Sequence, residues 1–257
     1  MAVGRTLTLG DTEITRIGLG TNRLRQMPEN VELIRQAVAA GIGMVDTAHT
    51  YTDGQSEATI GEALSPRPDG MVVATKGGYH PGTGSPEALS AQIEESLRRL
   101  RTEAIDLYYL HRVDPGTPLE ESLGAIAAYR ERGQIRHVGL SEVGIEQLER
   151  GRQVVPIAAV QNRYNLAERT HEEVIDHCAE QGIAFVPFFP LHAVDARPVA
   201  EIAARHGATP EQVVLAWLLA RSPAMLPIPG TLSLDHLQQN LAALELELSG
   251  DELDSLM

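Results

Sequence analysis

Apolar runs of strand length alternate with amphipathic, helix-like segments along almost the whole chain. Strands that alternate with helices are typical of a parallel sheet, because parallel neighbours need crossover connections. The runs are apolar throughout rather than alternately apolar and polar, so both faces of the sheet should be covered. The eight runs that we expect to be strands are 17–21, 44–46, 71–76, 105–111, 137–141, 158–161, 184–189 and 225–229.

Eight strand–helix repeats in 257 residues predict an α/β protein, a single (β/α)8 TIM barrel that occupies residues 1–257 as one domain. Residues 6–15, around Gly10-Asp11, predict an N-terminal β-hairpin that plugs the barrel from below. The alternative is a doubly wound open sheet, which usually has the pattern G-x-G-x-x-G after its first strand. Residues 18–23 read GLGTNR and lack the third glycine, so the barrel is favoured.

Hydroxyl side chains stand at the predicted helix starts, where they are typical N-caps. Ser85, Thr117 and Thr209 each precede a proline, which is favoured at the first helical position. Thr117 and Ser249 also have a glutamate three residues later, which completes the pattern of a capping box.

The formal net charge of −14 makes nucleic acid and anionic membrane surfaces poor partners, because both bind clusters of Lys and Arg. Cys178 is the only cysteine, so no intrachain disulfide can form, as is usual in a reducing cytosol. It lies in a helical pattern, and we expect both it and Trp217 in the core. The histidines lack metal-ligand spacing, so no metal site is expected. No apolar run approaches the roughly 18 residues of a membrane span, and residues 1–5 have no apolar signal core. We therefore expect a cytoplasmic protein.

Four polar residues stand at or just after the ends of predicted strands. Asp46, Lys76 and His111 close the second, third and fourth runs, and Tyr51 follows five positions after Asp46. Alone, each has a structural explanation as a turn residue, a solvated charge or a hydrogen-bond partner. In a parallel barrel, however, the C-terminal ends of all strands meet at one face, and that face carries the active site. We therefore expect these four side chains to form a catalytic group.

Together these side chains suit proton donation to a carbonyl oxygen. A phenol has a pKa of about 10, too high for efficient donation near neutral pH, and a neighbouring ammonium stabilises its anion. Lys76 would play that part beside Tyr51, held in place by Asp46, while His111 would orient the carbonyl. No side chain of the group supplies two electrons, so a hydride donor, a nicotinamide, is implied.

The same residues resemble the catalytic positions of aldo-keto reductases. The motifs are DTAxxY at 46–51, ATK at 74–76 and LH at 110–111, and the likeness extends from Ile17 to Asn240. The resemblance implies a (β/α)8 barrel that interconverts a small-molecule carbonyl and its alcohol with NAD(P)H, as a monomer or weak oligomer. The sequences of residues 139–143 and 161–166 are similar to those of bacterial members related to pyridoxal reductases.

By the same resemblance the cofactor is NADP(H), with NAD(H) possible. Ser141 and Gln161 would bind the nicotinamide carboxamide, and Phe188 would stack on the ring. Gly230 and His236 stand where many members have cations that bind the 2′-phosphate, so selection for NADPH would depend on other groups. The cofactor contacts that the resemblance implies are Gly20, Thr21, Asn22, Asp46, Ser141, Glu142, Gln161, Phe188, Phe189, Pro190, Leu191, Ile228, Gly230, Thr231, His236, Gln239 and Asn240.

Two other functions are compatible with such a barrel. One is a non-catalytic nucleotide-binding redox sensor or accessory subunit, although a pure binder has no need of all four polar groups. The other is a lyase that uses Lys76 as a Schiff-base amine, although Asp46 would keep that amine protonated. The carbonyl reductase is the function that the four groups favour.

Overall fold

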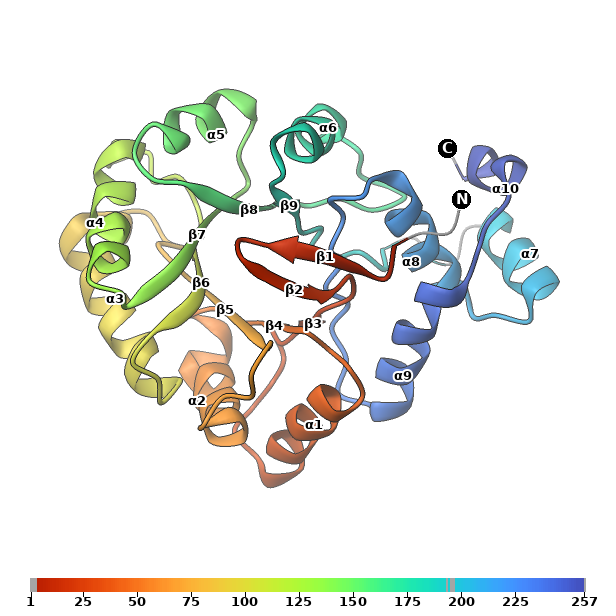
Figure 1. Cartoon of the computed structure of the whole chain (residues 1–257), viewed down its shortest axis with the longest axis horizontal. Helices are drawn as coiled ribbons and strands as arrows, with labels where there is room; N and C mark the ends of the chain where they lie inside the picture. Colours follow the sequence, from red (N-terminus) through yellow and green to blue (C-terminus); the bar gives the residue numbers. More distant parts are fainter. Residues whose placement is uncertain (1–3, 193, 195–196, 257) are drawn as a thin grey trace.

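The computed structural model of the chain describes residues 4–192, 194 and 197–256. Seven parallel strands form one curled sheet, and each strand pairs with the next one in the sequence (Figure 1). A doubly wound sheet would reverse its strand order at a switch point, so the expectation of a barrel is confirmed. The strands are β3 Leu19–Gly20, β4 Met44–Asp46, β5 Val72–Gly77, β6 Ile105–Leu110, β7 Ile135–Ser141, β8 Ile157–Gln161 and β9 Ala184–Phe185.

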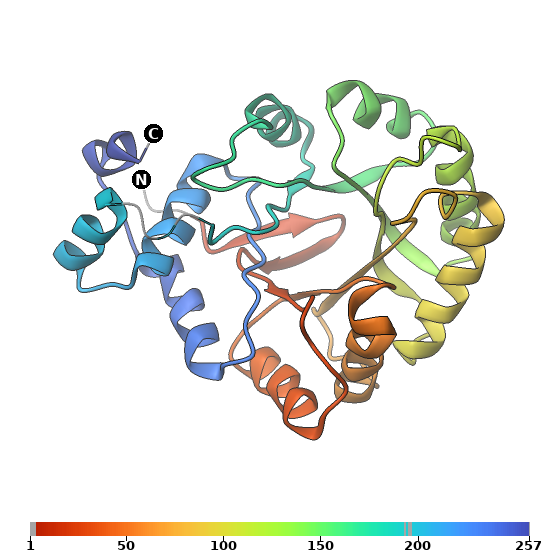
Figure 2. The ribbon, with the colours of Figure 1, turned by 180° about the vertical axis from the view of Figure 1, so that it is seen from behind.

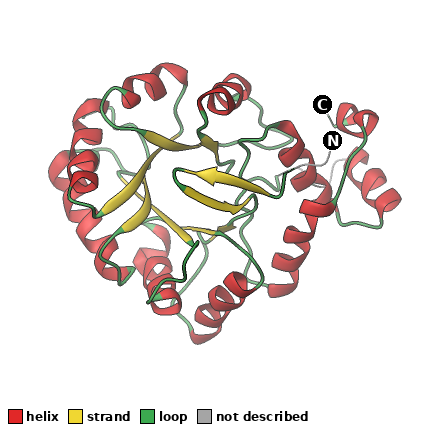
Figure 3. Ribbon diagram, in the orientation of Figure 1, coloured by secondary structure: helices red, strands yellow, loops and turns green. Residues whose placement is uncertain are grey.

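Helices surround the sheet, as the views from both sides show (Figures 1 and 2), and the strands lie inside this ring (Figure 3). The outer cover explains why the strands are apolar on both faces. The helices are α1 Pro28–Ala39, α2 Gln55–Leu64, α3 Pro86–Arg99, α4 Leu119–Glu131, α5 Ile145–Arg152, α6 Glu172–Gln181, α7 Arg197–His206, α8 Pro210–Arg221, α9 Leu234–Ala242 and α10 Gly250–Ser255, with 3-10 turns η1 Tyr51–Gly54 and η2 Ala243–Glu245.

The eighth expected strand, residues 225–229, is not a regular strand. It closes the barrel through two single parallel bridges, one from Phe185 to Met225 and one from Gly20 to Gly230. The barrel is therefore complete, but the joins of this segment to β9 and to β3 form a seam without a continuous ladder of hydrogen bonds.

The reason lies in two prolines of that segment. Pro227 and Pro229 have no N–H to donate, so they cannot take part in a regular ladder. Their carbonyl oxygens still accept hydrogen bonds from the amides of Gly18 at 3.0 Å and Gly20 at 3.3 Å. Sequence periodicity located the segment correctly and misjudged its regularity.

A buried arginine fastens the end of the hairpin to the chain that leads into the seam. The Arg16 guanidinium donates to the carbonyl oxygens of Met225 at 3.2 Å, Leu219 at 3.0 Å and Ser222 at 2.5 Å. Burial lowers the pKa of Arg16 to about 10. Backbone carbonyl oxygens thus replace water around this charge. The hydrogen bonds connect the N-terminal hairpin to the chain between Leu219 and Met225.

The expected N-terminal hairpin is confirmed. Strands β1 Thr6–Leu9 and β2 Thr12–Thr15 pair in antiparallel register and cross one end of the barrel (Figure 1). The side chains of Leu9 and Ile14 are buried in the cluster that fills the barrel interior, with residues such as Met44. The hairpin therefore plugs the end of the barrel opposite to the strand C-termini.

Three of the four expected helix caps are present. Ser85, Thr209 and Ser249 each accept a hydrogen bond from the backbone of the first helical turn. Thr117 does not, and α4 begins at Leu119 without a side-chain cap. The expectation was wrong because Thr117 belongs to the preceding turn, where its amide donates to the Asp114 carbonyl at 3.2 Å.

The expected core residues Cys178 and Trp217 are both buried. Burial raises the pKa of the Cys178 thiol to about 12, so it is a poor nucleophile. No helix in the described part of the chain is both long and apolar enough to cross a membrane. Residues 1–3, on which part of the expectation about a signal segment rests, lie outside the described residues.

Two helical glycines offer a matched test of the packing between α2 and α3. A Cβ on Gly61 would lie 2.2 Å from the carbonyl oxygen of Arg99, whereas a Cβ on Gly124 would meet nothing within 4 Å. We expect Gly61→Ala to lower the free energy of unfolding by about 1–3 kcal/mol, because the backbone must shift. Gly124→Ala should instead raise it by up to about 1 kcal/mol. Urea denaturation of both variants measures this difference, and equal effects would contradict it.

Candidate active site

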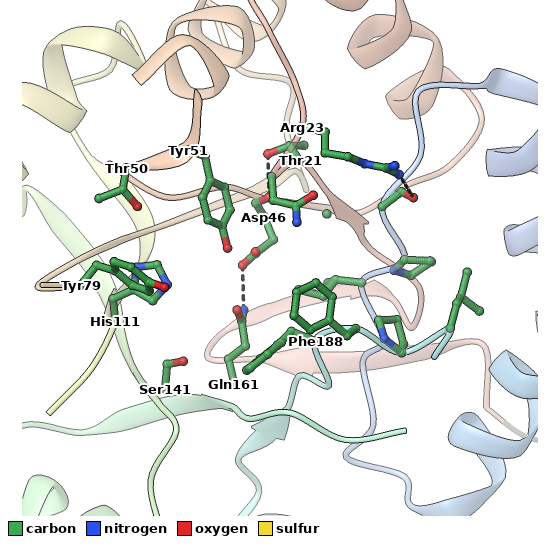
Figure 4. Close-up of a pocket in the computed structure, with 18 of the residues that line it drawn as sticks. Thr21, Arg23, Asp46, Thr50, Tyr51, Tyr79, His111, Ser141, Gln161 and Phe188 are labelled. Carbon is green, nitrogen blue, oxygen red and sulfur yellow. Dashed lines mark hydrogen bonds between the residues drawn. The ribbon is translucent and has the colours of Figure 1, made fainter. Parts of the chain in front are cut away.

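The four expected catalytic residues meet at the C-terminal ends of the strands. Asp46 ends β4, Lys76 lies in β5, His111 follows β6, and Tyr51 begins the 3-10 turn after β4. In parallel register Asp46 pairs with Ala74, two residues before Lys76 on the neighbouring strand. Figure 4 shows Tyr51 directed toward the space that Asp46 and His111 also face.

Asp46 is buried and has both carboxylate oxygens occupied. The Lys76 Nζ donates to Oδ1 at 2.6 Å. The Gln161 Nε2 donates to Oδ2 at 2.8 Å (Figure 4). Lys76 also donates to the Thr47 carbonyl at 2.6 Å. The carboxylate thereby links β4, β5 and β8 across the barrel, and the ammonium is held in a fixed place.

Lys76 is completely buried and remains charged. Burial alone lowers the pKa of Lys76, but the Asp46 carboxylate and the Tyr51 phenol outweigh it, and the net shift is upward. The Nζ atom lies 5.0 Å from the centre of the Tyr51 ring. A permanent positive charge therefore faces the phenol, and it stabilises the anion that forms when Tyr51 gives up its proton.

His111 is buried and neutral. Burial, then the nearby charges of Lys76, Arg112 and His80, lowers the pKa of His111 to about 2. Within the described part of the chain its Nδ1 has no hydrogen-bond partner and is shielded from solvent, which leaves Nε2 as the nitrogen open to the cavity. The Tyr51 ring packs edge-on against the imidazole, with the two ring centres 6.1 Å apart. A neutral imidazole beside a phenol can donate one hydrogen bond to the same oxygen atom that the phenol protonates.

This pKa shift predicts a pH dependence of stability. A histidine whose folded pKa is depressed costs stability as the pH falls below the unfolded value of about 6.5, because only the unfolded chain then gains the proton. Between pH 7 and pH 5, we expect the wild type to lose about 2 kcal/mol of unfolding free energy relative to His111→Gln. Urea denaturation at both pH values measures the gap, and a constant gap would show that His111 takes up a proton as readily in the folded protein as in the unfolded chain.

A cavity of about 760 Å³ opens beside these residues. It has the size of a typical small-molecule site. Fourteen of the expected catalytic and cofactor residues line it, namely Gly20, Thr21, Asn22, Asp46, Tyr51, His111, Ser141, Gln161, Phe188, Phe189, Pro190, Leu191, Ile228 and Gly230.

Several expected cofactor residues lie outside the cavity lining. The Glu142 carboxylate accepts a hydrogen bond from the Arg163 amide at 2.7 Å and is thereby committed to the loop after β8. Thr231 precedes α9, whose N-cap is Ser233, and the other three lie on that helix. These three are His236, Gln239 and Asn240. That these residues contact the cofactor stays a prediction. Such contacts would extend the site from the cavity toward α9.

The sequence interpretation missed two arginines of the cavity wall. Arg23 follows β3, and its Nη2 lies 3.4 Å from the Gly230 carbonyl oxygen (Figure 4). Arg112 directly follows His111 at the end of β6. Their place just after strand ends was the available signal, but exposed arginines in loops are common enough to escape notice.

The family model described as the aldo/keto reductase family matches residues 16–257. The chain belongs to the aldo/keto reductase family. It is therefore an oxidoreductase, as the four strand-end residues had indicated.

Known proteins similar to this aldo/keto reductase cover almost its whole length. An uncharacterized oxidoreductase of Schizosaccharomyces pombe is 37% identical, over 96% of this chain and 87% of the relative. Pyridoxine 4-dehydrogenase of Escherichia coli is 36% identical, over 98% of this chain and 96% of the relative. The similarity therefore extends over most of each sequence.

Solved structures agree on the fold. A thermostable aldo-keto reductase in complex with the inhibitor epalrestat superposes with a TM-score of 0.89 at 34% identity, covering 98% of each chain. An aldo-keto reductase of Klebsiella pneumoniae in complex with NADPH has a TM-score of 0.89 at 30% identity, covering 99% of this chain and 94% of that one.

The cavity of this aldo/keto reductase has the chemistry to hold a nicotinamide. Ser141 and Gln161 are paired in register at the ends of β7 and β8, so a hydroxyl and an amide lie side by side. The Gln161 amide N–H is used by Asp46, which leaves its oxygen to accept from a carboxamide. Phe188 faces the same space and offers a flat apolar surface (Figure 4). A planar ring with a carboxamide matches this set of groups.

Proposed function

We propose that the protein reduces an aldehyde or ketone to an alcohol with NADPH, and that Tyr51 donates the proton. One observation carries the proposal: a buried, charged Lys76 is fixed by Asp46 and faces the Tyr51 ring at 5.0 Å beside an open cavity. Such an arrangement has no evident structural purpose, because burying an ion pair contributes little net stability. It does lower the cost of moving a proton from a phenol.

A nicotinamide bound in the cavity would supply the hydride that reduces the carbonyl carbon. His111, neutral, donates a hydrogen bond to the carbonyl oxygen and orients it. Tyr51 transfers its hydroxyl proton to the same oxygen as negative charge develops there. Lys76 stabilises the resulting phenolate, and Asp46 keeps the ammonium from turning toward the cavity. Ser141, Gln161 and Phe188 would hold the nicotinamide in place.

We propose NADP(H) as the preferred cofactor, with NAD(H) as the weaker one. The NADPH complex of the 30% identical Klebsiella pneumoniae reductase supports this choice. In this chain Gly230 and His236 stand at the positions that were expected to carry cations. Arg23, whose guanidinium reaches the Gly230 carbonyl, brings a positive charge to the same part of the cavity wall.

We propose a small carbonyl compound, or the corresponding alcohol, as the substrate. The rim of the cavity includes the exposed rings of Tyr79 and Phe189, which suit a partly apolar molecule. The name of the Escherichia coli relative, pyridoxine 4-dehydrogenase, makes a pyridine aldehyde a reasonable first substrate to test. We further propose a single-domain protein over residues 1–257 that acts in the cytoplasm as a monomer or weak oligomer, without nucleic-acid partners.

The deciding experiment titrates the purified protein with NADPH and NADH while pyridoxal or another reactive aldehyde is present. We expect nicotinamide oxidation, with a lower KM for NADPH than for NADH. Fluorescence quenching without the aldehyde gives both dissociation constants independently. Tight binding of NADPH without oxidation of any aldehyde would contradict the reductase and favour the sensor. Equal constants for both nucleotides would contradict the preference for NADPH.

A further inference from the structure

The electrostatic character of the cavity differs from that of the whole protein. The formal net charge of the chain is −14, yet Asp46 is the only acidic residue among those that line the cavity in the described structure. Both oxygens of that carboxylate are occupied by Lys76 and Gln161. Arg23 and Arg112 contribute two full positive charges to the wall. An anionic molecule is therefore attracted to this cavity despite the overall charge.

Arg112 is held in an unusual way. Its Nη1 donates to the His111 carbonyl at 2.7 Å and to the Ser141 Oγ at 3.1 Å. Its guanidinium carbon lies 5.6 Å from the centre of the Tyr79 ring and 5.9 Å from that of the Phe188 ring. The two rings and two hydrogen bonds fix the guanidinium at the wall of the cavity.

Three other half-buried arginines form ion pairs with carboxylates at 3.2 Å or less, namely Arg67 with Asp106, Arg99 with Glu57 and Arg221 with Glu172. Among the described residues, Arg112 has no carboxylate within ion-pair distance, and its Nε and Nη2 make no hydrogen bond. A half-buried guanidinium without a counter-ion is costly, so the protein keeps here a charge that a ligand can neutralise.

We infer that Arg112 is a specificity-determining residue that binds a carboxylate group of the carbonyl substrate. The inference rests on the proposed reductase function. A guanidinium offers paired N–H groups that match the two oxygens of a carboxylate. Because Arg112 directly follows His111, which orients the carbonyl, the carboxylate lies a short chain away from the reacting carbon. The substrate class is thus an oxo acid rather than a neutral aldehyde.

The same geometry links Arg112 to the cofactor site. The Ser141 hydroxyl accepts from Arg112 and keeps its own proton, which it can donate to the oxygen of a carboxamide. One hydroxyl therefore connects the group that binds the substrate anion with the group that holds the nicotinamide. Fixing the carboxamide also fixes Arg112.

The test compares two aldehydes of equal length, 4-oxobutanoate and butanal, with NADPH as the reductant. We expect the wild type to prefer the oxo acid. In Arg112→Met, kcat/KM for 4-oxobutanoate should fall about tenfold to hundredfold more than kcat/KM for butanal, as expected for loss of hydrogen bonds to a charged group. The loss should appear mainly in KM, and Arg112→Lys should recover part of the preference.

Arg163→Met is the matched control, because Arg163 also packs on an aromatic ring, 5.6 Å from the centre of Phe189, but does not line the cavity. It should leave the ratio between the two aldehydes unchanged. A second readout is calorimetric binding of butanoate to protein saturated with NADP⁺, which should weaken in Arg112→Met.

The outcomes separate the inference from the function on which it rests. If Arg112→Met lowers kcat/KM equally for the two aldehydes and binds butanoate as tightly as the wild type does, Arg112 only positions His111. The inference then fails. If the wild type oxidises NADPH with neither aldehyde nor with pyridoxal, the proposed function fails instead. Unchanged thermal stability of the variant excludes unfolding as the cause of either result.

Discussion

Tyr51→Phe is expected to lower kcat about 10²–10⁴-fold, the usual contribution of a general acid, while the dissociation constant for NADPH stays nearly the same. The substitution removes one hydroxyl at the cavity and leaves the ring, which lies 5.0 Å from Lys76 and meets His111 edge-on. The carbonyl can still bind and be oriented, but no side chain supplies a proton to its oxygen. Steady-state kinetics and NADPH fluorescence measure the two effects separately.

Tyr79→Phe is the matched control for this loss. Tyr79 also lines the cavity, and its ring lies 4.7 Å from that of His111. It has no ammonium facing it among the described residues. We therefore expect a change in kcat of less than about tenfold, because no proton transfer is lost. Unchanged turnover in Tyr51→Phe, or an equally large loss in Tyr79→Phe, would overturn the assignment of the proton donor.

Lys76→Met is expected to abolish turnover and to lower the free energy of unfolding by about 3–5 kcal/mol. Methionine fills a similar volume but leaves the Asp46 carboxylate buried without a counter-ion, with only the Gln161 amide to stabilise it. The phenolate of Tyr51 also loses the charge that makes it accessible. Urea denaturation and steady-state kinetics of the same preparation test both consequences.

The double variant Asp46→Asn/Lys76→Met tests whether the uncompensated charge is the cause. It removes the carboxylate as well, so it should be more stable than Lys76→Met alone and remain inactive. Arg197→Met breaks an exposed pair with Glu201 and serves as the surface control, with an expected loss of about 0–1 kcal/mol. If Lys76→Met and Arg197→Met lower the free energy of unfolding equally, the buried pair contributes no more to stability than the exposed pair does.

The architecture was largely predictable because it follows from local patterns. Alternation of apolar strands with capped helices fixed the order of elements, and the strand ends located Asp46, Lys76 and His111 at one face. The irregular seam was not predicted, since hydrophobic periodicity does not register that Pro227 lacks a donor. Thr117 shows where a sequence motif is insufficient. Its capping pattern is complete, but its amide donates to the Asp114 carbonyl in the preceding turn, and its side chain does not cap the helix.

Contacts between distant parts of the chain were the hardest to foresee. The sequence interpretation assigned Gln161 to the cofactor alone, yet its amide N–H also completes the shell around Asp46, 115 positions away. Arg112 was missed because its place just after a strand end, the available signal, is shared by many solvated arginines. Its significance appears only when Ser141, Tyr79 and Phe188, from three other parts of the chain, are seen around it.

The seam of the barrel gives the cavity a mechanical role. Gly20 lies on one side of the seam and Gly230 on the other, and both line the cavity. A ligand that fills the cavity would contact both glycines. It would therefore bridge the part of the barrel wall that has no continuous ladder of hydrogen bonds. Because such a ligand binds the folded barrel and not the unfolded chain, its binding would raise the free energy of unfolding by mass action. The stability of the barrel at this join would therefore depend on the ligand concentration.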